Sequence, residues 1–352
     1  LAEARLVQGD FASAEQTARQ LEAGGLKPAL VWQREFLLCR ALLGRGQSEA
    51  ALLCSSNLVA LANVSAQPLL QAQSYVLQAE ALETLGRLEN ASAIYELNCN
   101  TNAPVDLQRQ ALFKIGELAL VRGRLAEAAQ ALTNYLERHP PGPAGDMALL
   151  ALGEIQLRQH LAAVANSPTN GPTTNLLHQA QANFTALLER FPHSAVTGKA
   201  QLNRGWCLAL ATNLTDSAAA FAAAADALPV SWDQAVARFK LADSQYQQGQ
   251  FAAAISNYSA VVVHGETTPE VKTNLCEPAL YQIVRASIEI TNKAAAEAAA
   301  DRLLEWFPES YVTESGLLFA GQGWARQGDA AKARSVFESL LLRFPNSSRE
   351  AQ

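Results

Sequence analysis

Hydrophobic and polar positions along the chain repeat with the period of about 3.6 residues that amphipathic helices have, and turn residues divide these helices into pairs. After the turn at Gly249, for example, Phe251 and Tyr258 would lie on the inner face of a second helix. The turn position recurs, most often 37 residues apart, at Gly9, Gly46, Gly86, Gly123, Asn175, Thr212, Gly249, Thr291 and Gly328. This spacing predicts helical hairpins that stack in chain order.

Small residues mark the places where the two helices of a hairpin would cross. Five positions after each turn stand Ala14, Ala51, Ala91, Ala128, Ala180, Ser217, Ala254, Ala296 and Ala333. Seven positions before the turn the chain again favours small residues, namely Cys39, Ala79, Gly116, Gly205, Ala242 and Gly321, with the bulky Val284 as a departure. Glycine costs about 1 kcal/mol relative to alanine inside a helix, so the glycines predict close approach of the facing helix. Seventeen positions after the turn, a proline would end the second helix at Pro140, Pro192, Pro229, Pro308 and Pro345.

Together, the small residues, the turn glycine and the terminal proline resemble the tetratricopeptide repeat. The resemblance covers essentially the whole chain and implies an all-α fold, a right-handed superhelical α-solenoid of about nine antiparallel helix-turn-helix repeats. A single solenoid over 1–352 would have approximate repeat boundaries at 1–29, 31–66, 68–104, 106–141, 145–194, 195–229, 231–268, 275–309 and 311–348. The chain departs from the family pattern in its longer unit, in the missing initial Trp, and at Thr212 and Thr291, which replace the turn glycine.

Three similar segments that end in proline, at 187–192, 303–308 and 341–345, point to a subset of this family. We call them the closing phrases. They are similar to repeats of bacterial cell-envelope proteins, such as the outer-membrane assembly lipoproteins and the periplasmic cell-division coordinator. This similarity favours a periplasmic or envelope-associated location over a cytoplasmic one. Because the chain opens at Leu1 with only the second half of a first helix, we expect it to be a fragment of a longer protein.

One interruption breaks the register of the hairpins. The helix that contains Gly153 predicts a turn at His160, but the next second helix aligns only if its turn is Asn175. The residues between them, 160–174, are rich in Pro, Asn, Thr and Gly, so we expect an inserted loop within the repeat 145–194. Such a loop would be a tolerated insertion without a role or, alternatively, part of a binding face.

Composition and motifs exclude several classes of function. The chain is 49% hydrophobic, carries a net charge of −6 and has no block of Lys and Arg, so a nucleic-acid partner is not expected. No apolar run reaches the roughly 18 to 20 residues that cross a bilayer. The sequence lacks the motifs of serine hydrolases, zinc peptidases, P-loops and dinucleotide sites. We therefore expect no enzyme activity, no cofactor and no metal.

Five cysteines show no metal-binding spacing. Cys39 and Cys54 fall on the two helices of one predicted hairpin. They are interpreted either as buried thiols that act as small apolar filler or as a disulfide pair.

Partners of the resembling family often lie in a concave groove lined by the first helix of each hairpin, at ten, six and three residues before the turn. At ten residues, this chain has Phe36, Val76, Phe113, Leu150, Leu202, Phe239, Tyr281 and Leu318; at six it has Arg40, Glu80, Glu117, Glu154, Trp206, Asp243, Arg285 and Gln322. At three, Glu83 and Tyr246 are the members expected to contact a partner. Acidic residues gather in the first half of the groove and disfavour an acidic C-terminal peptide as its ligand.

The functional interpretation is a non-catalytic scaffold or adaptor, active in bacterial envelope assembly, that binds a peptide or helical segment of a partner protein. That segment would be amphipathic and partly cationic. An alternative for the apolar row is that it forms the core between repeats while the carboxylates keep the surface soluble. An alternative for the whole chain is a non-catalytic arm of a larger enzyme, such as a glycan-processing one.

Overall fold

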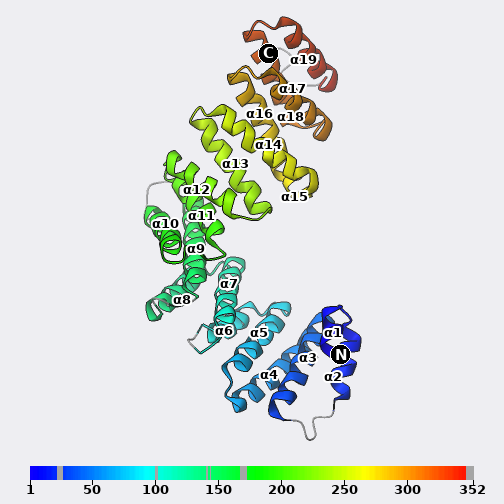
Figure 1. Ribbon diagram of the computed structural model, residues 1–352, viewed down its shortest axis with the longest axis vertical. Helices are drawn as coiled ribbons and strands as arrows, with labels where there is room; N and C mark the ends of the chain where they lie inside the picture. The colour runs from blue at the N-terminus through cyan, green and yellow to red at the C-terminus, as the bar shows by residue number, and fades with distance from the viewer. Residues whose placement is uncertain (22–26, 100–101, 140–141, 143, 167–172, 346–352) are drawn as a thin grey trace. The chain divides into compact units, whose positions relative to one another are not determined.

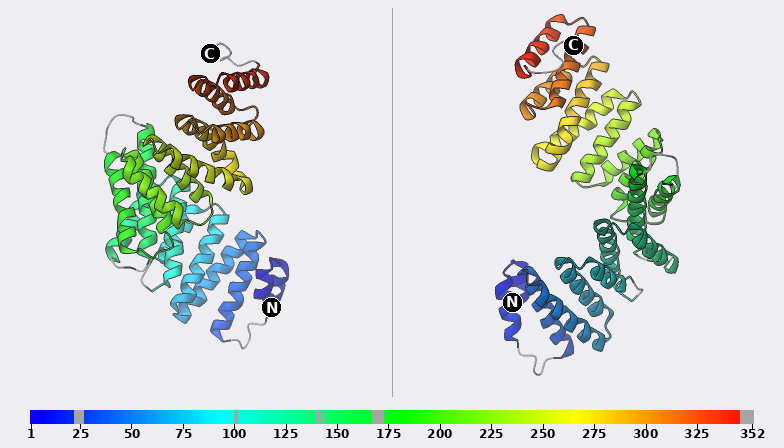
Figure 2. Two further views of the ribbon diagram at one scale, coloured as in Figure 1. Left: turned by 45° about the horizontal axis from the view of Figure 1, so that its top comes forward. Right: turned by 180° about the vertical axis from the view of Figure 1, so that it is seen from behind.

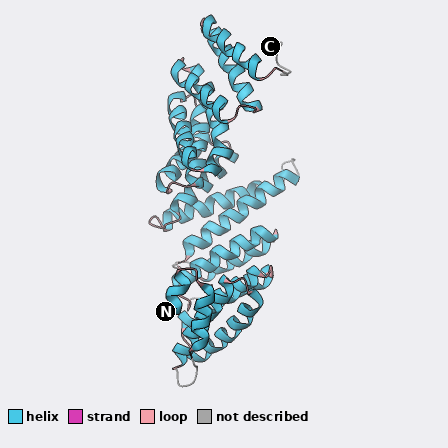
Figure 3. Cartoon of the chain, turned by 90° about the vertical axis from the view of Figure 1, so that its right-hand side faces the viewer, coloured by secondary structure: helices cyan, strands magenta, loops and turns pink. Residues whose placement is uncertain are grey.

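The computed structural model describes the chain apart from residues 22–26, 100–101, 140–141, 143, 167–172 and 346–352. In the described part, all regular secondary structure is helical and no strand is formed (Figure 3). The contacts between helices divide the chain into two compact units, Leu1–Arg190 and Phe191–Gln352. Each unit is a series of helix-turn-helix hairpins, which confirms the predicted fold class. The repeat boundaries and the single solenoid remain predictions.

Unit 1 contains helices α1 to α10 (Figure 1). Its first helices are α1 (Ala2–Val7), α3 (Pro28–Gly44), α5 (Pro68–Thr84), α7 (Val105–Arg122) and α9 (Gly145–Asn166). Its second helices are α2 (Phe11–Gln20), α4 (Ser48–Ser65), α6 (Leu88–Leu97), α8 (Leu125–Arg138) and α10 (Thr173–Arg190). Each second helix packs against its own first helix and against the first helix of the next hairpin of the unit.

Unit 2 continues the same arrangement (Figure 2). Its first helices are α11 (Thr197–Leu210), α13 (Trp232–Gln247), α16 (Glu277–Glu289) and α18 (Tyr311–Arg326); its second helices are α12 (Leu214–Ala227), α14 (Phe251–Thr267), α17 (Lys293–Trp306) and α19 (Ala330–Arg343). Between α14 and α16 lie the short helix α15 (Pro269–Val271) and the π-helical turn η1 (Lys272–Cys276). These additional turns account for the longer spacing between Gly249 and Thr291.

The predicted turns have the backbone conformation that favours glycine. Positive φ angles occur at Gly9, Gly46, Gly86, Gly123, Gly249 and Gly328, and also at Thr212 (60°) and Thr291 (56°), where a threonine replaces the expected glycine. Asn175 does not belong to this set, because it lies inside α10. Four of the predicted prolines, Pro192, Pro229, Pro308 and Pro345, stand two residues after the last residue of α10, α12, α17 and α19, whereas Pro140 lies outside the described residues.

The small residues lie at the helix crossings as predicted, since every one of the residues five positions after the turn is buried. A Cβ added to Gly205 would stand 2.7 Å from the ring of Phe221 on α12, and one added to Gly321 would stand 2.5 Å from the ring of Phe337 on α19. Gly116 behaves differently, because its nearest neighbour is Ala151 on α9, the first helix of the next hairpin. In two of the three cases, therefore, the glycine makes room for an aromatic ring of its own hairpin.

The predicted loop at 160–174 is wrong for most of its length. Helix α9 runs on through His160 to Asn166, and α10 already begins at Thr173. The physical reason is local: Leu161 to Ala165 are mostly strong helix formers, and no breaker occurs before Pro168. Residues 167–172, which include that proline, lie outside the described part of the chain. Leu161 and Val164 are nearly half exposed on the extension.

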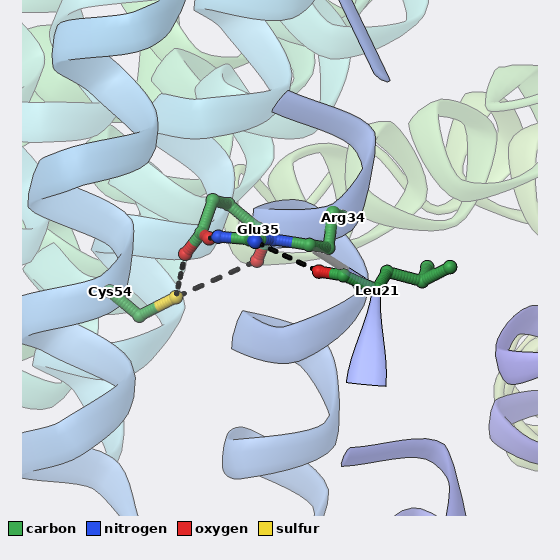
Figure 4. A network of polar contacts seen from close by, with 4 residues as sticks. All are labelled: Leu21, Arg34, Glu35 and Cys54. Carbon is green, nitrogen blue, oxygen red and sulfur yellow. Dashed lines mark hydrogen bonds and ion pairs between the residues drawn. The ribbon is translucent and has the colours of Figure 1, made fainter. Parts of the chain in front are cut away.

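The cysteines are free thiols. Cys39 on α3 and Cys54 on α4 are both buried; Cys39 Sγ donates to the carbonyl of Ala51 at 3.5 Å, and Cys54 Sγ lies 3.6 Å from the carbonyl and the carboxylate of Glu35 (Figure 4). Arg34 pairs with the same carboxylate and donates to the carbonyl of Leu21 at 3.0 Å. The neighbouring thiol of Cys54, through a hydrogen bond, and burial together raise the pKa of the Cys39 thiol. The pair therefore acts in this structure as buried apolar filler.

We expect Gly205→Ala to destabilise unit 2 by about 1 to 3 kcal/mol, because the added methyl group overlaps the buried ring of Phe221. Intrinsic helix propensity alone would give the opposite sign, a gain of about 1 kcal/mol. The measurement is the midpoint of urea unfolding followed by circular dichroism. Gly116→Ala is the matched control, since its new methyl group would stand 3.3 Å from the Ala151 methyl group, a tight contact that needs a shift of only a few tenths of an ångström. Equal effects of the two substitutions would refute the close packing at Gly205.

Candidate functional site

The predicted groove residues all lie on first helices. In unit 1 they are Phe36 and Arg40 on α3, Glu80 and Glu83 on α5, Phe113 and Glu117 on α7, and Leu150 and Glu154 on α9. In unit 2 they are Trp206 on α11, Phe239, Asp243 and Tyr246 on α13, and Tyr281 and Arg285 on α16. The two sets belong to different units.

The apolar row divides into core and surface. Leu150 and Phe239 are buried, as are Val76, Leu202 and Leu318 at the same register, so these side chains form core between helices. Phe36 and Tyr281 are half-buried, and so is Trp206, which stands outside the row at six residues before the turn. Phe113 differs from all of them because 46% of its surface is exposed. The interpretation as inter-repeat core therefore applies to most of the row, and Phe113 is the member most available to a partner.

The carboxylates of unit 1 gather around a lysine that the groove positions did not include. Lys114 Nζ lies 3.3 Å from Glu83 and 3.1 Å from Glu117, and the hydroxyl of Tyr95 on α6 donates to Glu83 at 2.6 Å. Burial raises the pKa of Glu80, and the negative charge of Glu83 adds to this effect, while Arg40 and Lys114 oppose it. Part of the predicted acidity is thus neutralised within the unit.

Four of the predicted residues line one shallow hollow between α7 and α9: Phe113, Glu117, Leu150 and Glu154. Gly116 and Ala151 are part of its lining, and their small side chains let the two helices approach. The hollow has a volume of about 30 Å³, which is close to the space of one water molecule. It can receive a single protruding group of a partner, but it is far smaller than a pocket for a metabolite or cofactor.

The first-helix face of unit 2 carries cations that lie over aromatic rings. Lys240 Nζ lies 5.2 Å from the ring centre of Trp206 and 5.1 Å from that of Phe239, and it forms an ion pair with Asp243 at 2.8 Å. The hydroxyl of Tyr258 on α14 donates to the same Asp243 at 2.6 Å. Asp243 is therefore engaged by two groups of its own unit.

Further along this face, Arg285 lies near the rings of Tyr246, Tyr281 and Phe319, which come from α13, α16 and α18. Burial raises the pKa of Tyr246, and the positive charge of Arg285 opposes the shift. Phe319, like Lys114 and Lys240, is a residue that the sequence analysis missed. All three stand nine positions before the turn, directly after the apolar row, and this common register is the signal that could have found them.

No group of His, Cys, Asp and Glu side chains in the described residues has an arrangement that would hold a metal ion. None of the described helices combines the length and the apolar character that a bilayer crossing requires.

Because burial raises the pKa of Glu80 above its ordinary value of 4.5, the folded chain holds this proton more tightly than the unfolded chain does. The contribution to stability is therefore most favourable at low pH and is lost as the pH rises through 4.5 toward the folded pKa. Glu80→Gln removes this loss. We expect the variant to be more stable than wild type at pH 7 and the difference to shrink toward pH 4, measured by urea unfolding at each pH. Glu137→Gln, on an exposed side chain of α8, is the control and should show no such trend.

Comparison with known proteins places these hairpins in a family. One model of the tetratricopeptide repeat matches residues 108–165 and 174–231, and a second model, also of the tetratricopeptide repeat, matches 236–263 and 320–347. No curated protein matches the chain.

Several solved structures show distant similarity. A monomeric mutant of IFIT1 with Gppp-AAAA is 14% identical, with a TM-score of 0.47, over 94% of this chain and 67% of that one. PilW, a widely conserved type IV pilus biogenesis factor, is 20% identical, with a TM-score of 0.41, over 68% of this chain and 95% of that one. PilF of Pseudomonas aeruginosa is 17% identical, with a TM-score of 0.43, over 69% and 95%.

The family matches cover the second half of unit 1 and much of unit 2, and the hairpins before them repeat the same turns and crossings. Over the matched residues the chain is similar to the tetratricopeptide repeat.

Proposed function

We propose that this chain is a non-catalytic scaffold that binds a peptide or helical segment of a partner protein on the first-helix face of unit 1. Tetratricopeptide repeats typically serve as protein-interaction scaffolds, because stacked hairpins present a long surface without a central cavity. The observation that carries the proposal is Phe113, a large and nearly half-exposed ring at the edge of the hollow between α7 and α9.

The chemistry of the hollow defines the segment it would bind. An apolar side chain of the partner would pack against Phe113, and burial of such a side chain contributes about 1.5 to 3 kcal/mol. Glu117 and Glu154 line the same hollow, so a neighbouring Lys or Arg of the partner would be attracted. An exposed ion pair adds only about 0 to 1 kcal/mol, so the carboxylates mainly steer the approach while the apolar contact supplies affinity.

The cellular setting that we propose is the bacterial cell envelope. It is supported by the closing phrases at 187–192, 303–308 and 341–345, which are similar to repeats of envelope assembly proteins. Within that setting the scaffold would hold a segment of another envelope protein during assembly.

Phe113→Ala should weaken the binding of peptides selected on the wild-type chain from a random-peptide phage library by about tenfold, mainly through faster dissociation, because the apolar anchor is lost. Surface plasmon resonance with the selected peptides gives both rates. Leu53→Ala, which truncates an exposed apolar side chain on the second helix α4, is the control and should leave both rates unchanged. Selected peptides that bind Phe113→Ala as tightly as wild type would show that this face is the wrong surface.

Charge on the same face should control the association rate. With a selected peptide that contains Lys or Arg, replacing Glu117 and Glu154 together by Gln should slow association, whereas Lys114→Gln should speed it, because Lys114 neutralises part of the acidic cluster. Both differences should diminish at high salt. Glu137→Gln on α8 is the control. Association rates that ignore all of these charges would contradict the steering role.

A further inference from the structure

The environment of Arg285 sets the face of unit 2 apart from that of unit 1. The guanidinium carbon lies 5.0 Å from the ring centre of Tyr246, 5.8 Å from that of Tyr281 and 5.8 Å from that of Phe319. These rings come from three successive first helices, so the arrangement depends on the stacking of three hairpins. We call Arg285 and these three rings the Arg285 cluster.

Most of the hydrogen-bonding capacity of Arg285 is unused within the described residues. Its Nη1 donates to Oε1 of Gln282 at 3.1 Å, and this amide is neutral. A guanidinium has five N–H donors, whose planar fork matches a carboxylate. In the described part of the chain, no carboxylate lies within the 4.0 Å of Arg285 that would define an ion pair.

The nearby acidic residues, Asp243 and Glu289, form no ion pair with the guanidinium of Arg285. Asp243 on α13 is paired with Lys240 and accepts the hydroxyl of Tyr258. Glu289, one turn further along α16, is exposed and stands outside ion-pair distance of Arg285. Two other first-helix cations, by contrast, are matched by an acid: Lys114 by Glu83 and Glu117, and Lys199 by Asp233 at 2.7 Å. Arg285 is held in place by rings and is not neutralised by a partner.

A second guanidinium extends the positive charge. Arg326 lies 5.8 Å from the ring centre of Phe319 and donates to the carbonyl of Gln322, one turn back on α18. Phe319 is thus contacted by two arginines. Stacking on aromatic rings restricts the rotamers of a long side chain, so less conformational freedom remains to be lost when a ligand binds.

We propose that the Arg285 cluster anchors a carboxylate side chain of an internal, acidic segment of a partner protein. Bidentate hydrogen bonds from Arg285 would hold the Asp or Glu, and apolar residues beside it would pack on the exposed edges of Tyr281 and Phe319. This inference rests on the proposed scaffold function and adds a second, oppositely charged contact on the face of unit 2. It differs from the acidic cluster of unit 1 in the sign of the charge it recognises.

The same cations and rings could also suggest a nucleic acid, but the arrangement favours a protein. Bases stack on free ring faces, and here the guanidinium of Arg285 already lies over the rings. Phosphate binding also gains strength from many clustered cations, whereas this chain has a net charge of −6. A single acidic side chain with apolar neighbours matches the local charge better.

The test is a random-peptide phage library selected on the full chain and on Arg285→Gln, with deep sequencing of both pools. Peptides enriched on wild type should include a class rich in Asp or Glu, and this class should be lost with Arg285→Gln. Synthetic members of the class should bind Arg285→Gln about tenfold or more weakly, because a charge-assisted hydrogen bond is removed. Arg285→Lys, which keeps the charge without the planar fork, should give an intermediate loss. Arg343→Gln, on an exposed side chain near the end of α19, should change nothing.

The outcomes separate this inference from the proposed function. An acidic class that persists on Arg285→Gln, or enriched peptides that depend on Phe113 but contain no acidic class, would overturn the Arg285 anchor and leave the scaffold function standing. Absence of any enriched peptide would count against both. A single-stranded RNA oligonucleotide that binds wild type and fails to bind Arg285→Gln would replace the protein partner with a nucleic acid. Circular dichroism and the unfolding midpoint of each variant show whether the fold is retained.

Discussion

In two hairpins of unit 2 the helices meet where a glycine on one helix faces an aromatic ring on the other, as Gly205 faces the ring of Phe221 and Gly321 that of Phe337. The hairpins depend on this contact because a stacked array has few long-range contacts to replace it. In two other hairpins the large side chain on the second helix is a tyrosine, Tyr95 or Tyr258. Each is fully buried, and its hydroxyl donates a hydrogen bond to a carboxylate. The acceptors, Glu83 and Asp243, lie on the first-helix face. The packing core therefore fixes side chains of the candidate interaction surface.

This link explains why acidic residues on the first helices are not simply solvated charges. Burial raises the pKa of both tyrosines, so the hydroxyls remain protonated donors at neutral pH and hold the carboxylates in one position. A lysine completes each arrangement, Lys114 in unit 1 and Lys240 in unit 2, at equivalent positions of their hairpins. Each lysine offsets part of the negative charge of the carboxylates around it. The net negative charge that a partner meets is therefore smaller than the number of acidic residues suggests.

The two units are built from the same kind of hairpin but present different side chains on their first-helix faces. In unit 1 the exposed ring of Phe113 stands beside carboxylates, whereas in unit 2 the rings of Tyr246, Tyr281 and Phe319 surround a guanidinium. The hairpins also persist where the repeat length is irregular. The helix α9 extends through seven residues of the predicted insertion, and η1 accommodates additional residues before α16. In both places the backbone hydrogen bonds stay within helices, which avoids unpaired polar groups.

The sequence by itself determined the hairpins, their turns and their crossings, because these features depend on residues close together in the chain. A positive φ at Gly249 or a small side chain at Ala254 is a local requirement, and equivalent residues recur along the chain. The extent of α9 was also a local property, but turn-forming residues further along the segment outweighed the helix formers from Leu161 to Ala165 in our interpretation. The side chains on the first-helix face could be named from their register alone.

Only the tertiary structure decided which of those side chains are core and which are surface. Leu150 and Phe113 occupy equivalent positions, yet one is buried between helices and the other is nearly half exposed. Likewise, the sequence showed Arg285 and Asp243 as equivalent members of one row, whereas the structure pairs Asp243 with Lys240 and places Arg285 among rings from three helices. Exposure and pairing depend on how neighbouring hairpins pack, and contacts between different repeats are not encoded in the periodicity of any one of them.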